Sequence, residues 1–417
     1  HMAKDELEIG EGGAKGHGAT GLAGCVAIVG QTGGEGNSRR ACRQGKRVNG
    51  LTASESGFME KKSAQCAPLR IAPGRRHRRA ATARPCVRHR FRRKLRRRGG
   101  EDRAERTLAQ IVLLDVPIDC GKRGRGCVMG PDAFRVADLA GALAALGHDI
   151  DDRGTLAPLP ADPVPGPAHL HALAETADWT RALIPAARDA VAAGFALFMG
   201  GDHALSLGSV AGVAAEAAVR GVPQFVLWLD AHADIHTPQT TESGHLHGTP
   251  IAYLTGRAGF GAFPAPPAPL PEENVCLFGL RSVDPAEREV LADSAIAAVD
   301  MRRIDEQGIA RPLTAFLERV RAAGGRLHVS LDVDFLDPAA APGVLTTVPG
   351  GASVREAHLV MEILHDSGLV ASLDLVELNP ALDERGRTAG LMVDLAASLM
   401  GRRVFDRPTP RAGGRPD

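Results

Sequence analysis

The chain has 417 residues, of which 44% are hydrophobic and 24% charged, and its formal net charge is +1. This length allows one large α/β domain with an extension, or two domains. No uninterrupted apolar run approaches the roughly 18 residues of a membrane-spanning helix, so the sequence excludes a protein that crosses the membrane by such helices. The seven cysteines form no CxxC pair. They therefore exclude a disulfide framework and a zinc ribbon, and they favour a reducing, cytoplasmic location.

The near-zero net charge conceals two different parts. Residues 1–100 carry 23 Lys and Arg against 7 Asp and Glu, a net of +16, which leaves −15 for residues 101–417. Residues 75–98 are especially dense in arginine, and such a composition cannot bury enough apolar surface to fold. We therefore expect residues 1–107 to be a basic, Gly- and Arg-rich extension that is disordered or an artefact of start-site choice. We expect a folded domain at 108–405 and a flexible tail at 406–417.

A basic arm of this kind raises one alternative class of function. Clustered arginines release counterions from a phosphate backbone, so the chain could be a nucleic-acid-binding protein that acts through the arm. However, only Phe91 is available in the basic run to stack on bases, and no folded RNA-binding motif accompanies it. The composition favours a solvated tail over a nucleic-acid partner.

The folded part alternates apolar runs of strand length with segments of helical apolar spacing. In chain order we predict a strand within 108–118, a helix that begins near Pro131 and ends at Gly147, a helix within 168–193, a strand at 195–199 followed by a Gly-Gly turn and a helix, a strand from Phe225 to Leu229, a strand at 274–280, a helix at 314–322, a strand at 326–331, a helix at 354–364, a strand at 370–378 and a helix at 388–400. This alternation predicts a three-layer α/β/α fold with a central parallel sheet, in which ligands collect at the carboxyl ends of the strands.

Candidate metal ligands follow three of these strands. Residues two apart on a strand point the same way, so an extended conformation from Asp230 through His232 to Asp234 would bring the three side chains together. Taken singly, a His after a Gly-Gly turn is more often a hydrogen-bonded loop residue, and a D-x-D pair is more often a helix cap or a solvated turn. The combination in one sheet predicts a metal site formed by His203, Asp230, His232, Asp234, Asp332 and Asp334.

Six such ligands are too many for one tetrahedral zinc ion. They suit two divalent cations, and the oxygen-rich set favours Mn²⁺, although ligand chemistry does not separate it cleanly from Co²⁺ or Fe²⁺. Two such ions make hydroxide available near neutral pH. Glu377, at a neighbouring strand end, is either a surface glutamate or a partner for a planar cation such as guanidinium. His247 is either a loop-stabilising histidine or a proton carrier.

Several motifs together resemble the arginases of the ureohydrolase superfamily. GGDHALSLGS, DAHADIHTPQTTESGHLHG, GLRSVDPAE, SLDVDFLDP, VPGG and LDLVELNP occur in the same order and at similar spacing, from about Ile111 to Gly401. The resemblance implies an arginase-like fold and two Mn²⁺ per subunit. It also implies hydrolysis of L-arginine to L-ornithine and urea by a metal-bridging hydroxide. Proteins of this kind form trimers or hexamers, so it further implies a homo-oligomer.

The resemblance also implies individual roles. The six metal-ligand candidates would bind the two ions, with Asp230 and Asp334 in bridging positions. Asp234 would stabilise the tetrahedral intermediate, His247 would shuttle protons, and Glu377 would hold the substrate guanidinium. The residues that match substrate-binding positions are His236, Thr241, Ser243, His245, Asp284, Glu287, Thr346 and Glu377.

Three departures from the family pattern bear on the substrate. His236 and His245 stand where many arginases have asparagine, and Leu345 precedes Thr346 where the family often has glycine. Glycine there would permit close backbone approach or positive φ, so we expect Leu345 to affect the position of Thr346. An agmatinase or guanidinobutyrase activity on the same site is therefore the nearest alternative. The T-x-S-G run at Thr241 favours a substrate with an α-carboxylate.

Overall fold

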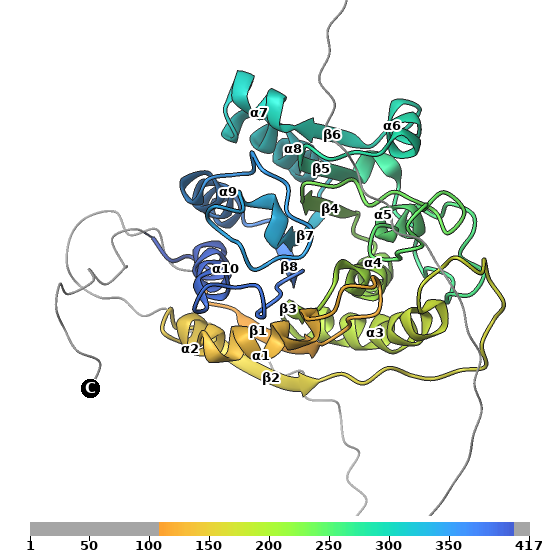
Figure 1. Ribbon diagram of the computed structural model, residues 1–417. Helices are drawn as coiled ribbons and strands as arrows, with labels where there is room; N and C mark the ends of the chain where they lie inside the picture. Colours follow the sequence, from red (N-terminus) through yellow and green to blue (C-terminus); the bar gives the residue numbers. More distant parts are fainter. Residues whose placement is uncertain (1–107, 404–417) are drawn as a thin grey trace, which may run out of the picture. The chain divides into compact units, whose positions relative to one another are not determined.

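A computed structural model of the protein describes residues 108–403 (Figure 1). The predicted basic extension at 1–107 and the predicted tail at 406–417 lie outside the described residues. Within residues 108–403, no helix combines the length and the apolar character needed to cross a membrane.

One eight-stranded sheet forms the centre of the domain, and every strand pair in it is parallel. This confirms the predicted fold class. The strands, in their order across the sheet, are β2 (Asp149–Thr155), β1 (Gln110–Val116), β3 (Phe195–Gly200), β8 (Val370–Val376), β7 (Arg326–Asp332), β4 (Gln224–Leu229), β5 (Val275–Leu280) and β6 (Ala297–Asp300).

Helices cover both faces of the sheet (Figure 1). One face packs against α1 (Gly130–Val136), α2 (Leu139–Ala144), α7 (Met301–Gln307), α8 (Ala310–Ala322), α9 (Val354–Ser367) and α10 (Arg387–Leu399). The other packs against α3 (Leu173–Ala193), α4 (Ser206–Val219), α5 (Pro250–Leu254) and α6 (Pro285–Ala292). Because both faces are covered, the inner strands read as nearly continuous apolar runs, as in the fully buried β4, QFVLWL.

The structure differs from the predicted elements in two respects. The helix expected to run to Gly147 is broken at Asp138, which has φ 60° and accepts a hydrogen bond from the backbone N–H of Gly141, so that α2 begins there. The edge strands β2 and β6 were not predicted. β2 is polar and largely exposed, and β6 has only 4 residues, so neither carries the apolar run that marks a buried strand.

The sheet order places the candidate ligands together. Strands β3, β8, β7 and β4 are consecutive neighbours, and their parallel carboxyl ends meet at one edge of the sheet. The extended conformation predicted from Asp230 to Asp234 is wrong, because β4 ends at Leu229 and Asp234 has φ 49°. A turn after the strand, rather than strand alternation, brings these side chains toward one another.

Candidate active site

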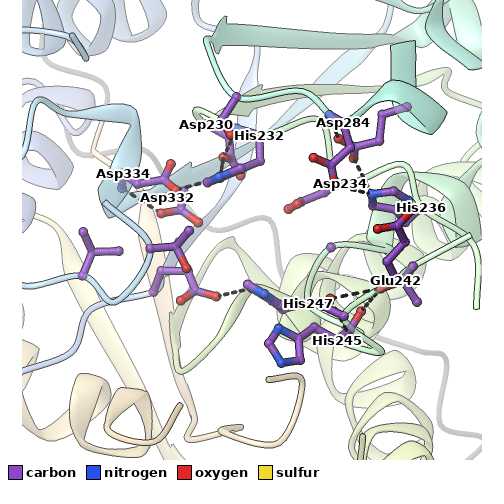
Figure 2. A pocket seen from close by; sticks show the side chains of 18 residues that line it. Asp230, His232, Asp234, His236, Glu242, His245, His247, Asp284, Asp332 and Asp334 are labelled. Carbon is purple, nitrogen blue, oxygen red and sulfur yellow. Dashed lines mark hydrogen bonds and ion pairs between the residues drawn. The ribbon is translucent and has the colours of Figure 1, made fainter. Parts of the chain in front are cut away.

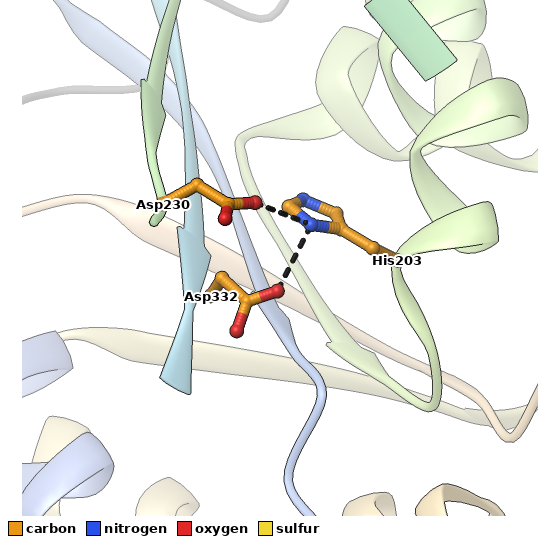
Figure 3. A group of neighbouring side chains, drawn as sticks. All are labelled: His203, Asp230 and Asp332. Atoms are coloured by element: carbon orange, nitrogen blue, oxygen red, sulfur yellow. Dashed lines mark ion pairs between the residues drawn. The ribbon is translucent and has the colours of Figure 1, made fainter. Parts of the chain in front are cut away.

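Two groups of side chains capable of holding a metal ion share Asp230. In the first, His203 Nδ1 lies 3.0 Å from Asp230 Oδ2 and 3.0 Å from Asp332 Oδ2 (Figure 3). In the second, His232 Nδ1 lies 2.9 Å from Asp334 Oδ2 and 3.4 Å from Asp230 Oδ1. Each oxygen of Asp230 therefore faces a different group, as a bridging carboxylate would. Asp334 belongs to one group only, so its bridging role stays a prediction.

The ring of His203 is fixed by contacts on two sides. It stacks on Trp228 of β4 with centroids 4.0 Å apart and 3° between the planes. Its Nε2 lies 2.8 Å from Ser330 Oγ on β7. When Nε2 donates to the serine, Nδ1 presents a lone pair to the carboxylates, which is the form that binds a cation. Asp234 Oδ2 joins the first group at 3.2 Å from the same Nδ1.

The electrostatics of these groups suit divalent cations. Burial, and then the charges of Asp334 and Asp230, raise the pKa of Asp332 well above its usual range. Burial and Asp230 raise the pKa of Asp334 to about 6. His203 Nδ1 is buried and lacks a hydrogen-bond partner. Carboxylates that repel one another around a ring nitrogen of this kind are stabilised by bound cations, and the oxygen-rich donor set fits two hard divalent ions.

Backbone and arginine contacts hold the ligand loops. Asp334 Oδ1 accepts from the Ala231 N–H at 3.0 Å, and Asp332 Oδ1 accepts from the Asp334 N–H at 2.7 Å. The guanidinium of Arg281 donates to the carbonyls of Asp334 and, at 2.8 Å, of Val348. These bonds tie together the segments that follow β4, β5 and β7. No role was predicted for Arg281.

A cavity of about 460 Å³ opens over the two groups (Figure 2). The structure brings nearly all of the predicted site residues to its lining, and His203 alone lies behind it. The predicted residues that line it are Asp230, His232, Asp234, His236, Thr241, Ser243, His245, His247, Asp284, Glu287, Asp332, Asp334, Thr346 and Glu377. Glu242, Gly248, Ser282 and Val344 also line it and were not predicted.

His247 and Glu377 contact each other beside the metal-ligand candidates. His247 Nδ1 lies 3.0 Å from Glu377 Oε1, which also accepts from the His203 N–H at 2.8 Å. Glu377 has φ 67°, a conformation that is costly for a residue with a side chain and that is found at functional sites. Burial opposes its charge, but Lys122 and His247 hold the pKa of Glu377 well below its usual range.

Lys122 is the functional candidate that sequence reasoning missed. Its ammonium pairs with Glu377 Oε2, and its side chain is only 1% exposed. Burial disfavours the charged ammonium, yet Glu377 raises its pKa above the ordinary value. In the sequence it stands beside other cations in a Gly-rich loop, CGKRGRG. That composition is typical of a solvated loop, so no sequence signal marked it.

The predicted carboxylates near the α-amino position differ in how they are held. Both oxygens of the buried Glu287 accept backbone N–H groups, from Ile235 at 3.2 Å and from Asp284 at 3.0 Å. The side chain of Asp284 is 70% exposed, and its Oδ2 lies 3.0 Å from His236 Nε2. Asp284 is therefore the carboxylate free to meet a ligand, whereas Glu287 fastens the segment after Asp234.

The loop beyond the ligands contains several hydrogen bonds among its own polar groups. Thr241 Oγ1 lies 3.2 Å from Ser243 Oγ and donates to the carbonyl of His245 at 3.3 Å. The ring of His245 lies 5.7 Å from that of His247. Burial, then the nearby His247, His171 and Arg123 side chains, lower the pKa of His245 to about 4.

Leu345 does not displace Thr346 from the cavity. Thr346 lines the cavity, and the side chain of Leu345, 41% exposed, packs toward Gly124. Leu345 is absent from the residues with positive φ in the described part of the chain. Glycine is therefore not required at this position.

Comparisons with known proteins agree with this geometry. A sequence model of the arginase family matches residues 109–401. The arginase of Brucella abortus biovar 1 is 58% identical over 299 residues, which are 71% of this chain and 98% of that protein. The arginase of Agrobacterium fabrum is 55% identical over 312 residues, 74% of this chain and 95% of that protein. The crystal structure of the Bacillus caldovelox arginase superimposes with a TM-score of 0.65 at 35% identity, covering 71% of this chain and 100% of that one. The chain belongs to the arginase family.

Proposed function

We propose that this protein is an arginase, which hydrolyses L-arginine to L-ornithine and urea. The observation that carries the proposal is the pair of His–carboxylate groups that share Asp230 and line a cavity of about 460 Å³. Relatives named arginase at 55–58% identity support the same activity. The six metal-ligand candidates would hold two Mn²⁺ per subunit. Such ions lower the pKa of a shared water, so that hydroxide is available near neutral pH.

The side chains of this chain account for the remaining steps. Attack at the guanidinium carbon makes that carbon tetrahedral, and Asp234, at the cavity wall, is placed to accept hydrogen bonds from its nitrogens. The C–N bond to the ornithine side chain then breaks, and the leaving amine requires a proton. His247 lines the cavity and is oriented by Glu377 through Nδ1, so its ring supplies the proton path.

Recognition of the amino acid end falls to the outer part of the cavity. The exposed carboxylate of Asp284 suits the α-ammonium group, and Thr241 and Ser243 offer hydroxyls to the α-carboxylate. His236 is held to Asp284, so it limits where that carboxylate can point. The resemblance assigns Glu377 to the guanidinium, but its contacts here support a role in orienting His247.

A substrate comparison tests the proposal. The full chain, purified and loaded with Mn²⁺, should release urea from L-arginine and little or none from agmatine, which has no α-carboxylate. Turnover of agmatine with none of arginine would assign the site to the nearest alternative. Metal analysis of the protein as purified would decide between Mn²⁺, Co²⁺ and Fe²⁺.

Three further assignments belong to this proposal. We infer a cytoplasmic location from the cysteine usage and a homo-oligomer, trimer or hexamer, from the family, which native mass spectrometry would test. Because the family match begins at residue 109, we propose that catalysis does not need the basic arm. A chain without residues 1–107 should release urea undiminished. A salt-sensitive loss of RNA binding with the arm, beside an inactive domain, would support the nucleic-acid alternative.

A further inference from the structure

Lys122 is a buried cation for which the proposed chemistry has no use. Its side chain is 1% exposed and does not line the cavity, so it cannot contact a substrate there. Its ammonium pairs with Glu377 Oε2, and the side chain of Glu377 is 4% exposed. Burying two charges is costly unless they are paired and hydrogen-bonded, so the position of one strongly constrains the other.

The two oxygens of Glu377 have separate partners. Oε1 faces the backbone N–H of His203 at 2.8 Å and His247 Nδ1 at 3.0 Å. Oε2 faces Lys122 and, at 3.7 Å, the thiol of Cys127. A carboxylate offers about four lone-pair positions, so these partners fill it. Without Lys122, one oxygen would lose its charged partner and the carboxylate would be free to rotate away from His247.

The backbone fixes the ammonium relative to His247. The carbonyl of Gly121 accepts from the N–H of His247 at 3.1 Å, and the Gly121 N–H donates to Asp202 Oδ2 at 2.7 Å. A Cβ at Gly121 would lie 2.7 Å from Asp202 Oδ1, so only glycine fits this close approach. The loop that carries Lys122 is therefore fastened to the segment that carries His247.

We propose that Lys122 is a positioning residue, which pairs with one oxygen of Glu377 and so keeps the other oxygen directed at His247. The inference rests on the proposed function, because the step that it serves is proton delivery through His247. It predicts that Lys122 affects turnover rather than substrate affinity.

Lys122→Met removes the charge and keeps most of the length of the side chain. In the full, metal-loaded chain we expect kcat for urea release to fall about 10- to 100-fold, with KM for arginine changed by less than about threefold. Lys122→Gln keeps a donor and should recover part of the lost kcat. Arg123→Met is the matched control, since it removes one charge from the neighbouring, exposed position, and its kcat should equal that of the unmodified chain.

A double-mutant cycle with Glu377→Gln separates positioning from a general structural effect. If Lys122 acts through Glu377, adding Lys122→Met to Glu377→Gln should lower kcat no further. The double variant should also have a higher Tm than Lys122→Met alone, because no unpaired carboxylate is left buried. The Tm comparison remains informative if Lys122→Met is too unstable to assay for activity.

Three results would overturn the proposal: a rise in KM without a fall in kcat, losses of kcat that multiply in the Glu377→Gln background, or a Lys122→Met variant as active as Arg123→Met.

The proposed function and the proposed role of Lys122 can be refuted separately. An unmodified chain that releases no urea from arginine would refute the proposed function and leave the Tm cycle valid, whereas a fully active chain with independent effects of the two substitutions would refute only the role of Lys122.

Discussion

The metal-ligand candidates and the loop from His236 to His247 contribute to one cavity but are held in different ways. The ligands lie at the carboxyl ends of β3, β7 and β4 in the sheet, and His203, Asp230 and Asp332 are each 3% exposed or less. The loop is held by contacts among its own threonine, serine and histidine side chains and by hydrogen bonds to neighbouring segments, such as that from the His247 N–H to the carbonyl of Gly121. The sheet therefore positions the metal-ligand candidates, whereas the loop that we propose to recognise the amino acid end of the substrate lies outside the sheet.

The largest effect should come from the residue that both ligand groups share. Asp230→Ala removes the carboxylate whose two oxygens face His203 and His232, so we expect loss of bound metal and no measurable urea release. Metal content and activity should be measured on the same sample. Full activity in this variant would refute the dinuclear assignment.

His247→Ala should separate catalysis from metal binding. The ring is hydrogen-bonded to Glu377 and to none of the metal-ligand candidates. Both metals should therefore remain bound. We expect kcat to fall about 10²- to 10⁴-fold, the usual contribution of a positioned general acid or base. If the variant loses its bound metal together with its activity, His247 is itself a metal ligand.

Glu287 and Asp284 offer a test within the outer part of the cavity. Glu287→Ala leaves the buried backbone N–H of Ile235 and the partly buried N–H of Asp284 without their acceptor. We expect the free energy of unfolding to fall by about 1–3 kcal/mol per group left without a partner, as an upper range. Chemical denaturation of the metal-loaded variant measures it, and an unchanged midpoint would contradict the structural role.

Asp284→Asn should act on the substrate instead of on stability. Its carboxylate is largely exposed, and an exposed ion pair contributes up to about 1 kcal/mol, so KM for arginine should rise up to about fivefold. The KM of a guanidino acid that lacks the α-amino group should be unchanged. An equal rise in both KM values would remove Asp284 from recognition of the ammonium.

His245 should give the smallest effect. Its lowered pKa of about 4 means that it loses its proton on folding only between about pH 4 and about pH 6.5. Its contribution to stability is therefore complete above the unfolded value of about 6.5 and is lost as the pH falls toward 4. The pH profile of activity above pH 6 should be the same in His245→Asn. NMR titration of the ring checks the cause, and a folded-state pKa near 6.5 would contradict it.

The sequence was informative where long-range topology imposes a pattern. Buried parallel strands read as apolar runs, and the motifs at their carboxyl ends located the ligands, because the carboxyl ends of neighbouring strands meet. Local backbone geometry was not predictable in the same way. No pattern in the sequence marks the left-handed conformation of Asp234 or that of Glu377, because such a conformation depends on the surrounding structure.

Pairings between distant loops were also invisible in the sequence. Lys122 and Glu377 are 255 residues apart, and a lysine between glycines and arginines resembles a solvated residue. The structural use of Glu287 was missed for a related reason, since the same carboxylate serves equally well as a helix cap or as a ligand for an ammonium group.

We propose that two metal ions held around Asp230 make this cavity an arginine hydrolase. Titrating the metal-depleted chain with Mn²⁺, while measuring urea release from L-arginine and bound metal together, tests it most directly. We expect little activity without metal and a plateau at two Mn²⁺ per subunit. A plateau at one ion per subunit, or full activity in the metal-free chain, would contradict it.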